Sequence, residues 1–127
     1  MVPPNLHFYV DDVESDWIYE SHEAFDFIHG RSMGGSISNW DRLCSQAVEH
    51  LKPGGWIELQ EYEGRIVSED DPELEKCPNI LLWQKTVVEA SLRFGRSMDI
   101  TSSLKENLSK TGLLDVQDDV YKVRLCR

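Results

Sequence analysis

An amphipathic helix between two strand-like segments is the feature that most constrains the fold. Its apolar residues recur at i, i+3, i+4, i+7, i+8 and i+11, which places them on one helix face: Trp40, Leu43, Cys44, Ala47, Val48 and Leu51. Pro53 cannot continue the helix, and the glycines after it release the chain. β-Forming residues predict strands over 24–30 and 56–62. Strand, helix and strand with short joints form a right-handed parallel crossover by default, so the sequence predicts an α/β fold.

Local signals predict two more helices. Proline opens the segment 78–94 and Gly95 follows it, which is the usual asymmetry of helix ends. A further helix is expected over 101–111, where Ser103 and Glu106 offer a capping box. For the first helix, the expected cap is Ser38, with Asp41 three residues later in a capping-box-like arrangement.

Two further segments have strand character. Residues 6–10, LHFYV, are rich in β-formers and end at a pair of aspartates that favour a turn. Residues 113–125 form a second such segment, and its apolar alternation changes face between Val120 and Tyr121. We expect this last segment to be an antiparallel strand beside the parallel pair.

Charge and composition narrow the classes of function. The 127 residues suit one domain, and the net charge of -10 disfavours binding to phosphate backbones. No apolar run approaches the roughly 20 residues that cross a bilayer, so no membrane partner is expected. The three cysteines are far apart, which favours reduced thiols and a cytoplasmic or nuclear location. The acidic segment 63–77 is interpreted as a solvated loop, with a docking surface for a basic partner as the alternative.

Five stretches resemble one family closely. They are PPNLHFYVDDVESDW, FDFIHGRSMGGSISNW, LKPGGWIELQEY, RFGRSMDI and GLLDVQDDVYKV. Together and in this order they resemble the C-terminal half of the fungal LaeA-like class I S-adenosylmethionine-dependent methyltransferases, a family associated with the regulation of secondary metabolism. LKPGG alone is common to many methyltransferases, whereas the whole series is far more specific.

The resemblance implies a partial Rossmann-like sheet with helices packed on it. In it, residues 24–30 and 56–62 correspond to the fourth and fifth strands of the family, and an antiparallel strand ends the domain. The family's glycine-rich cofactor turn has no counterpart, since no G-x-G-x-x-G occurs in the sequence. We therefore expect residues 1–127 to be a single truncated methyltransferase-like domain. Gly34 and Gly35 are interpreted as part of a turn, not a phosphate loop.

The resemblance implies S-adenosylmethionine as the cofactor and places part of its site. Asp12 and Val13 match the position at which a carboxylate accepts from the adenine amine and the next backbone N–H donates to the ring. The alternative is that Asp12 merely closes a turn with the aspartate before it.

Residues His29, Gly30 and Arg31, with Ser32, match the loop that flanks the transferred methyl group. His29 is the one candidate for a general base, because imidazole titrates near neutral pH. The alternative for His29 is a strand-end histidine with local hydrogen bonds. The four histidines show no spacing typical of a metal site, so none is expected.

The sequence is compatible with three functional hypotheses. The first is a methyltransferase that is incomplete and weak or inactive as this chain. The second is a non-catalytic regulatory module that forms a homo-oligomer or binds a protein through an exposed sheet edge. The third is a fragment without an independent function. All four tryptophans are interpreted as core and inter-element packing, with an aromatic cage as the alternative; they are Trp17, Trp40, Trp56 and Trp83. Cys44 is interpreted as an inert buried thiol.

Overall fold

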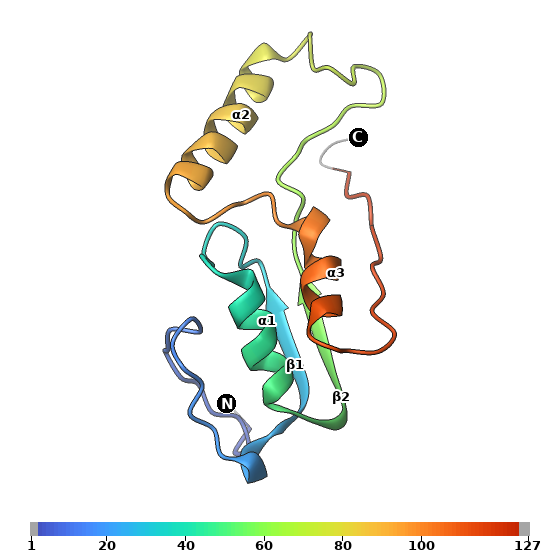
Figure 1. The fold of residues 1–127 in the computed structure, drawn as a ribbon. Helices are drawn as coiled ribbons and strands as arrows, with labels where there is room; N and C mark the ends of the chain where they lie inside the picture. The colour runs from blue at the N-terminus through green and yellow to red at the C-terminus, as the bar shows by residue number, and fades with distance from the viewer. Residues whose placement is uncertain (1–2, 125–127) are drawn as a thin grey trace.

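The computed structural model describes residues 3–124. Its elements are the 3-10 helix η1 (Ser21–Glu23), β1 (Phe25–Arg31), α1 (Trp40–Glu49), β2 (Leu51–Gln60), α2 (Pro78–Arg93) and α3 (Thr101–Lys110). The two strands form a parallel pair, which confirms the predicted α/β class and the strand, helix, strand unit. α1 and α3 lie side by side against the pair, and α2 lies beyond the carboxyl ends of the strands (Figure 1).

The register of the pair contains one interruption. Phe25 pairs with Leu51, but Phe27 already pairs with Trp56, so residues 52–55 loop out of β2. Gly54 in this loop has a φ of +82°, which favours glycine. The predicted turn at Pro53 is therefore real, but β2 begins five residues before the expected Trp56 because Leu51 pairs ahead of the loop.

The core lies between α1, α3 and the inner face of the sheet. It contains Ile37, Trp40, Leu43, Ile100 and Leu104, with Trp17, Met33 and Leu59 packed against it. Cys44 is only 1% exposed, and burial raises the pKa of its thiol to about 11. Its predicted role as an inert buried thiol is confirmed.

Both predicted helix caps are wrong. The α1 cap is Asn39, whose side-chain oxygen accepts from the Arg42 backbone N–H at 2.9 Å, because Ser38 is engaged by Glu14 instead. α3 starts after Ile100 without a side-chain cap. Ser103 lies inside α3, where its hydroxyl donates to the Ile100 carbonyl at 3.0 Å, and is therefore not the cap.

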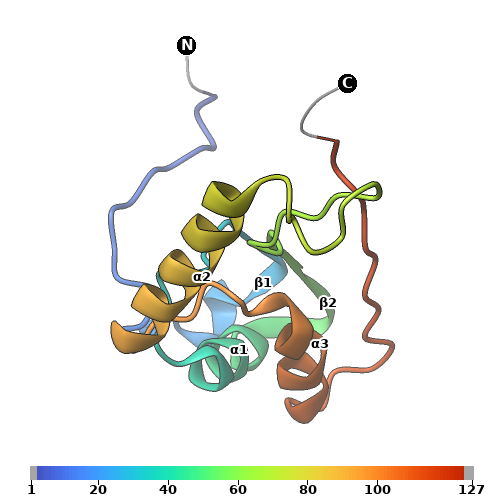
Figure 2. The same cartoon turned by 90° about the horizontal axis from the view of Figure 1, so that it is seen from above.

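The two outer strand-like segments are not strands in the described chain. Residues 6–10 pair with no strand, and Phe8 and Val10 are 77% and 107% exposed. Residues 113–124 likewise contain no strand, and residue 125 lies outside the described residues. β-Propensity forms a strand only where a neighbour supplies backbone partners, and neither segment lies in a ladder. The described segments nearest to either end of the chain run away from the helices and the sheet (Figure 2).

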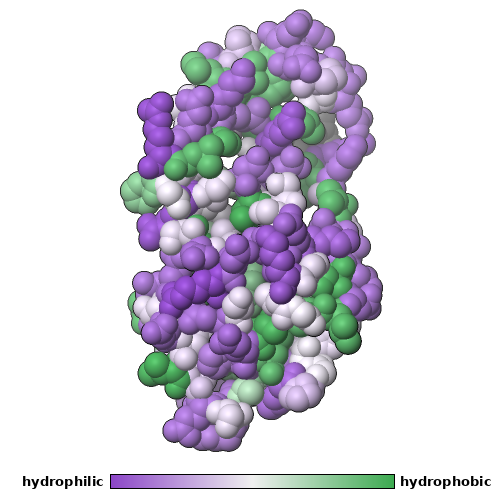
Figure 3. Space-filling view, viewed as in Figure 1, coloured by the Kyte–Doolittle hydropathy of each residue, from purple (hydrophilic) through white to green (hydrophobic). Residues whose placement is uncertain are grey.

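The tryptophans divide into two groups. Trp40 is buried and Trp17 packs on the core, but Trp56 and Trp83 are 70% and 55% exposed, so the latter pair do not belong to the core. Trp56 lies on the sheet face that no helix covers, and Trp83 lies on α2, where only Gln84 is buried. Apolar side chains of α2 reach the surface (Figure 3).

The looped-out segment makes a first prediction. Gly54→Ala should lower the free energy of unfolding by about 1 kcal/mol, because a Cβ is disfavoured at positive φ although nothing lies within 4 Å of it. The matched control is Gly64→Ala, which also meets nothing within 4 Å but has no positive φ. Urea unfolding of both variants measures the difference, and equal midpoints would contradict the assignment of strain to Gly54.

Candidate functional site

The carboxyl edge of the parallel pair is the place where a ligand site is expected, because open α/β sheets bind ligands there. Residues 32–36 follow β1 at this edge and residues 61–64 follow β2. Residues 34–36 form a turn, which confirms that Gly34 and Gly35 belong to a turn.

Glu61 holds the two loops together. Its carboxylate oxygens accept from the backbone N–H groups of Met33 at 2.7 Å and Gly34 at 3.0 Å. Gly35 has a φ of +77°, and a Cβ there would lie 2.8 Å from Met98 Cγ. The loop after β1 is thus fixed from one side by Glu61 and packed from the other by Met98.

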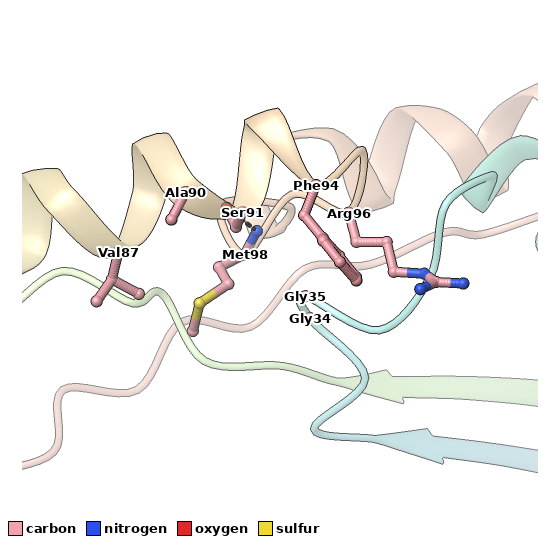
Figure 4. A pocket seen from close by; sticks show the side chains of 8 residues that line it. All are labelled: Gly34, Gly35, Val87, Ala90, Ser91, Phe94, Arg96 and Met98. Carbon is pink, nitrogen blue, oxygen red and sulfur yellow. Dashed lines mark hydrogen bonds between the residues drawn. The ribbon is translucent and has the colours of Figure 1, made fainter.

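A groove of about 440 Å³ lies between this loop and α2. Its lining consists of Gly34, Gly35, Val87, Ala90, Ser91, Phe94, Arg96 and Met98 (Figure 4). A smaller cavity of about 100 Å³ shares Gly34 and Met98 with it and extends to Glu61 and Tyr62. The groove is therefore the larger of these two hollows.

Arg96 supplies the charge of the groove. Its Nη2 lies 3.7 Å from Glu14 Oε2, and its guanidinium carbon lies 5.6 Å from the centre of the Phe94 ring. Its buried Nε has no hydrogen-bond partner within residues 3–124. A buried N–H without a partner is costly, so this group favours an acceptor.

Glu14 anchors the turn that carries Asp12 and Val13. Its Oε1 accepts from the Ser38 hydroxyl at 2.7 Å and from the backbone N–H groups of Ser38 and Asn39 at 2.9 and 3.0 Å. The Ser38 hydroxyl is the main cause that lowers the pKa of Glu14; burial opposes it. Arg42 also donates to the Glu14 carbonyl. The turn is therefore docked on the first residues of α1.

The turn leaves one hydrogen-bond acceptor and one donor free. Asp12 Oδ1 accepts from the Glu14 N–H at 3.0 Å, which is the turn-closing role expected as the alternative. Within the described residues, its other oxygen and the Val13 N–H have no hydrogen-bond partner. Both residues are exposed. The Asp12 carboxylate thus closes the turn with one oxygen and keeps the other free to accept a hydrogen bond.

The candidates at the end of β1 do not share one face of the strand. His29 Nδ1 lies 2.9 Å from Glu58 Oε2, and its ring stacks on Phe27 on the open face of the sheet. Gly30 belongs to the opposite face, because a Cβ there would lie 2.5 Å from Met33 Cε. Arg31 is exposed and pairs with Gln60.

The predicted residues are not brought together around the groove. Within the described chain, no hydrogen bond or ion pair joins the turn at Asp12 and Val13 to residues 29–31, and none of these five lines the groove. Sequence reasoning missed Phe94, Arg96 and Met98 as lining residues. The signal that pointed to them was the family-like stretch RFGRSMDI, which contains all three.

Two further features bear on function in residues 3–124. No group of three or more His, Cys, Asp or Glu side chains there is arranged to hold a metal ion. No helix in this part of the chain is both long enough and apolar enough to cross a bilayer.

Comparison with known proteins decides the family. A family model described as "Methyltransferase domain" matches residues 2–117. The chain belongs to this methyltransferase family. Such domains are generally of the S-adenosylmethionine-dependent class, which the sequence resemblance also indicated.

The curated relatives are fungal. The chain is 37% identical over 121 residues to "Methyltransferase pytC" of Aspergillus terreus, covering 95% of this chain and 36% of that protein. It is 33% identical over 124 residues to "Secondary metabolism regulator LAE1" of Cochliobolus heterostrophus, covering 96% and 40%. It is 27% identical over 122 residues to "Methyltransferase cpsF" of Aspergillus campestris, covering 96% and 43%.

The matches confirm the resemblance to LaeA-like proteins. The chain spans between 36% and 43% of the length of these three relatives. No solved structure matches the chain.

The Glu14 anchor makes a pH prediction. Because the folded state lowers the pKa of Glu14, its charge stabilises the fold above the ordinary pKa of 4.5, and this contribution is lost as pH falls through the lowered value. Glu14→Gln should therefore melt below the wild type at pH 7, and the gap should narrow progressively below pH of about 4.5. Thermal unfolding across this range measures it.

The matched control is Glu63→Gln, since Glu63 is exposed and has no hydrogen bond or ion pair within residues 3–124. Its melting temperature should follow the wild type at every pH. A Glu14→Gln gap that stays constant from neutral to acidic pH would show that the charge of Glu14 contributes nothing.

Proposed function

We propose that this chain forms part of the cofactor and acceptor site of an S-adenosylmethionine-dependent methyltransferase. The observation that carries the proposal is the methyltransferase family match over residues 2–117. The groove at the carboxyl edge of the parallel strands supports it, because this edge is the usual ligand site of such sheets.

In the proposal, Asp12 and Val13 hold the adenine edge. The free Asp12 oxygen accepts from the exocyclic amine, and the free Val13 N–H donates to the ring. Residues His29, Gly30 and Arg31 lie beside the reacting methyl group, which the cofactor supplies as an electrophile on its sulfonium. Methyl transfer needs mainly in-line positioning, so the fixed loops contribute more than a strong base.

His29 is the candidate base within this proposal. With Nδ1 donating to Glu58 at 2.9 Å, Nε2 remains the acceptor of the ring. The carboxylate would also stabilise the imidazolium that forms when the acceptor's proton is taken. The pair lies on the open face of the sheet, where it is accessible from outside.

Calorimetric titration with S-adenosylmethionine tests the cofactor assignment. We expect weak binding, with a Kd on the order of 100 μM, because the sequence supplies the adenine edge without a glycine-rich turn. Asp12→Ala should weaken binding about tenfold, which corresponds to about 1.4 kcal/mol.

The control for this titration is Asp118→Ala, an exposed aspartate far along the chain that has no hydrogen bond or ion pair within the described residues. It should bind as the wild type does. A folded chain that gives no heat of binding, or an Asp12→Ala variant with unchanged affinity, would refute the assignment.

A second candidate function is a non-catalytic module that associates with a second copy of the chain. The accessible surface is 10598 Å², whereas a compact monomer of 14.7 kDa exposes about 6900 Å². Phe27 and Trp56 are register partners on the open sheet face and are 55% and 70% exposed. The net charge of -10 disfavours nucleic acid as the partner.

Sedimentation velocity tests the association. The wild-type chain should sediment as a dimer at micromolar concentration, and Trp56→Ser should shift it toward the monomer because the open face loses its largest apolar side chain. Trp83→Ser on α2 is the control and should leave the dimer intact, although Trp83 is 55% exposed too. A monomeric wild type over the whole concentration range would exclude this candidate.

A further inference from the structure

The groove under α2 combines an apolar wall with a single cation at one end. Val87, Ala90 and Phe94 descend from α2 and its C-terminal end, and Met98 closes the middle (Figure 4). Gly34 and Gly35 form the opposite side; a Cβ at Gly35 would lie 2.8 Å from Met98 Cγ, and one at Gly34 would lie 3.3 Å from Glu61 Oε2. The volume of about 440 Å³ falls within the range of small-molecule sites, about 300–1000 Å³.

Arg96 determines the charge that the groove favours. Its guanidinium has five donors, its Nε has no partner within the described chain, and its nearest carboxylate is Glu14 at the long separation of 3.7 Å. Guanidinium matches carboxylate in a planar, two-point geometry. The chain as a whole is acidic, so an anion is attracted here only by this local cation.

The loop beside the groove excludes a phosphate cradle. Phosphate sites in glycine-rich loops use several free backbone N–H groups. Here the Gly34 N–H donates to Glu61 at 3.0 Å, and the Gly35 N–H donates to the Ser97 carbonyl at 2.9 Å. Both donors are taken, which removes a backbone cradle for phosphate and leaves the Arg96 fork as the donor for an anion.

We propose that this groove binds a small molecule with an aromatic or aliphatic body and one carboxylate, with the body against Phe94 and Met98 and the carboxylate on Arg96. The identification of this ligand as the methyl acceptor rests on the proposed function. Its binding in the groove does not, because it involves no contact with the cofactor.

The test is an NMR titration of the 127-residue chain in the absence of cofactor. The probes are 2-naphthoate and its neutral amide, 2-naphthamide, which share one ring system and differ in charge. We expect 2-naphthoate to bind at millimolar concentration, to shift the backbone amides of Gly35 and Met98, and to bind about tenfold more tightly than the amide. Arg96→Gln should abolish this preference, whereas Arg93→Gln, which does not line the groove, should retain it.

A second variant tests the location. Ala90→Leu places a larger side chain into the groove and should weaken both probes, while the spectrum reports that the fold is kept. Equal affinity of acid and amide for the wild type, or shifts confined to residues outside the groove, would overturn the proposal whether or not the variants fold. If the naphthoate titration fails but S-adenosylmethionine binds, the groove assignment is wrong and the proposed function stands. If 2-naphthoate binds as expected but S-adenosylmethionine does not, the groove assignment stands and the proposed function is wrong.

Discussion

The packing of α1 on the parallel pair is the interaction on which the described structure depends. Two parallel strands cannot be joined by a tight turn, so the chain must cross over, and α1 is that crossover. Trp40, Leu43, Cys44 and Ala47 are all buried on one face of it. Each fully buried apolar side chain of this size contributes about 1.5–3 kcal/mol, except for the smaller Ala47. This packing fixes where β1 ends and hence where the loop of the groove begins.

Two carboxylates then use the geometry that α1 provides. Glu14 accepts from backbone and hydroxyl groups at the start of α1, and Glu61 accepts from two N–H groups of the loop before it. Hydrogen bonds to an ionised acceptor are stronger than neutral ones. Part of the large acidic excess therefore serves to fix loops, which explains why a chain of net charge -10 can still hold a well-defined carboxyl edge.

Structural features that depend on the pattern within one segment could be predicted from the sequence. Features that depend on contacts between distant segments could not. The apolar face of α1, the proline start of α2 and the parallel pair all follow from local signals. Residues 6–10 have the composition of a strand, but a strand also needs a paired backbone, and that is not encoded within the segment. Ser38 is a suitable residue type for a cap, but its hydroxyl donates to Glu14, 24 residues earlier, and Asn39 caps α1 instead. The stretch RFGRSMDI pointed to Arg96, but its place in the groove could not be predicted because it depends on the space between α2 and a loop about 60 residues earlier in the chain.

Glu14 also links the two parts of the proposed site. It directly follows Asp12 and Val13 in the turn; one of its oxygens holds the start of α1, and the other lies 3.7 Å from Arg96. A carboxylate ligand on Arg96 competes with that long ion pair, whereas the three hydrogen bonds to the other oxygen stay in place. The turn would therefore keep its position while the groove fills. The charge of Glu14 is thus a direct route by which an adenine at Asp12 and an acid at Arg96 would be coupled, and such coupling is reciprocal for the two ligands.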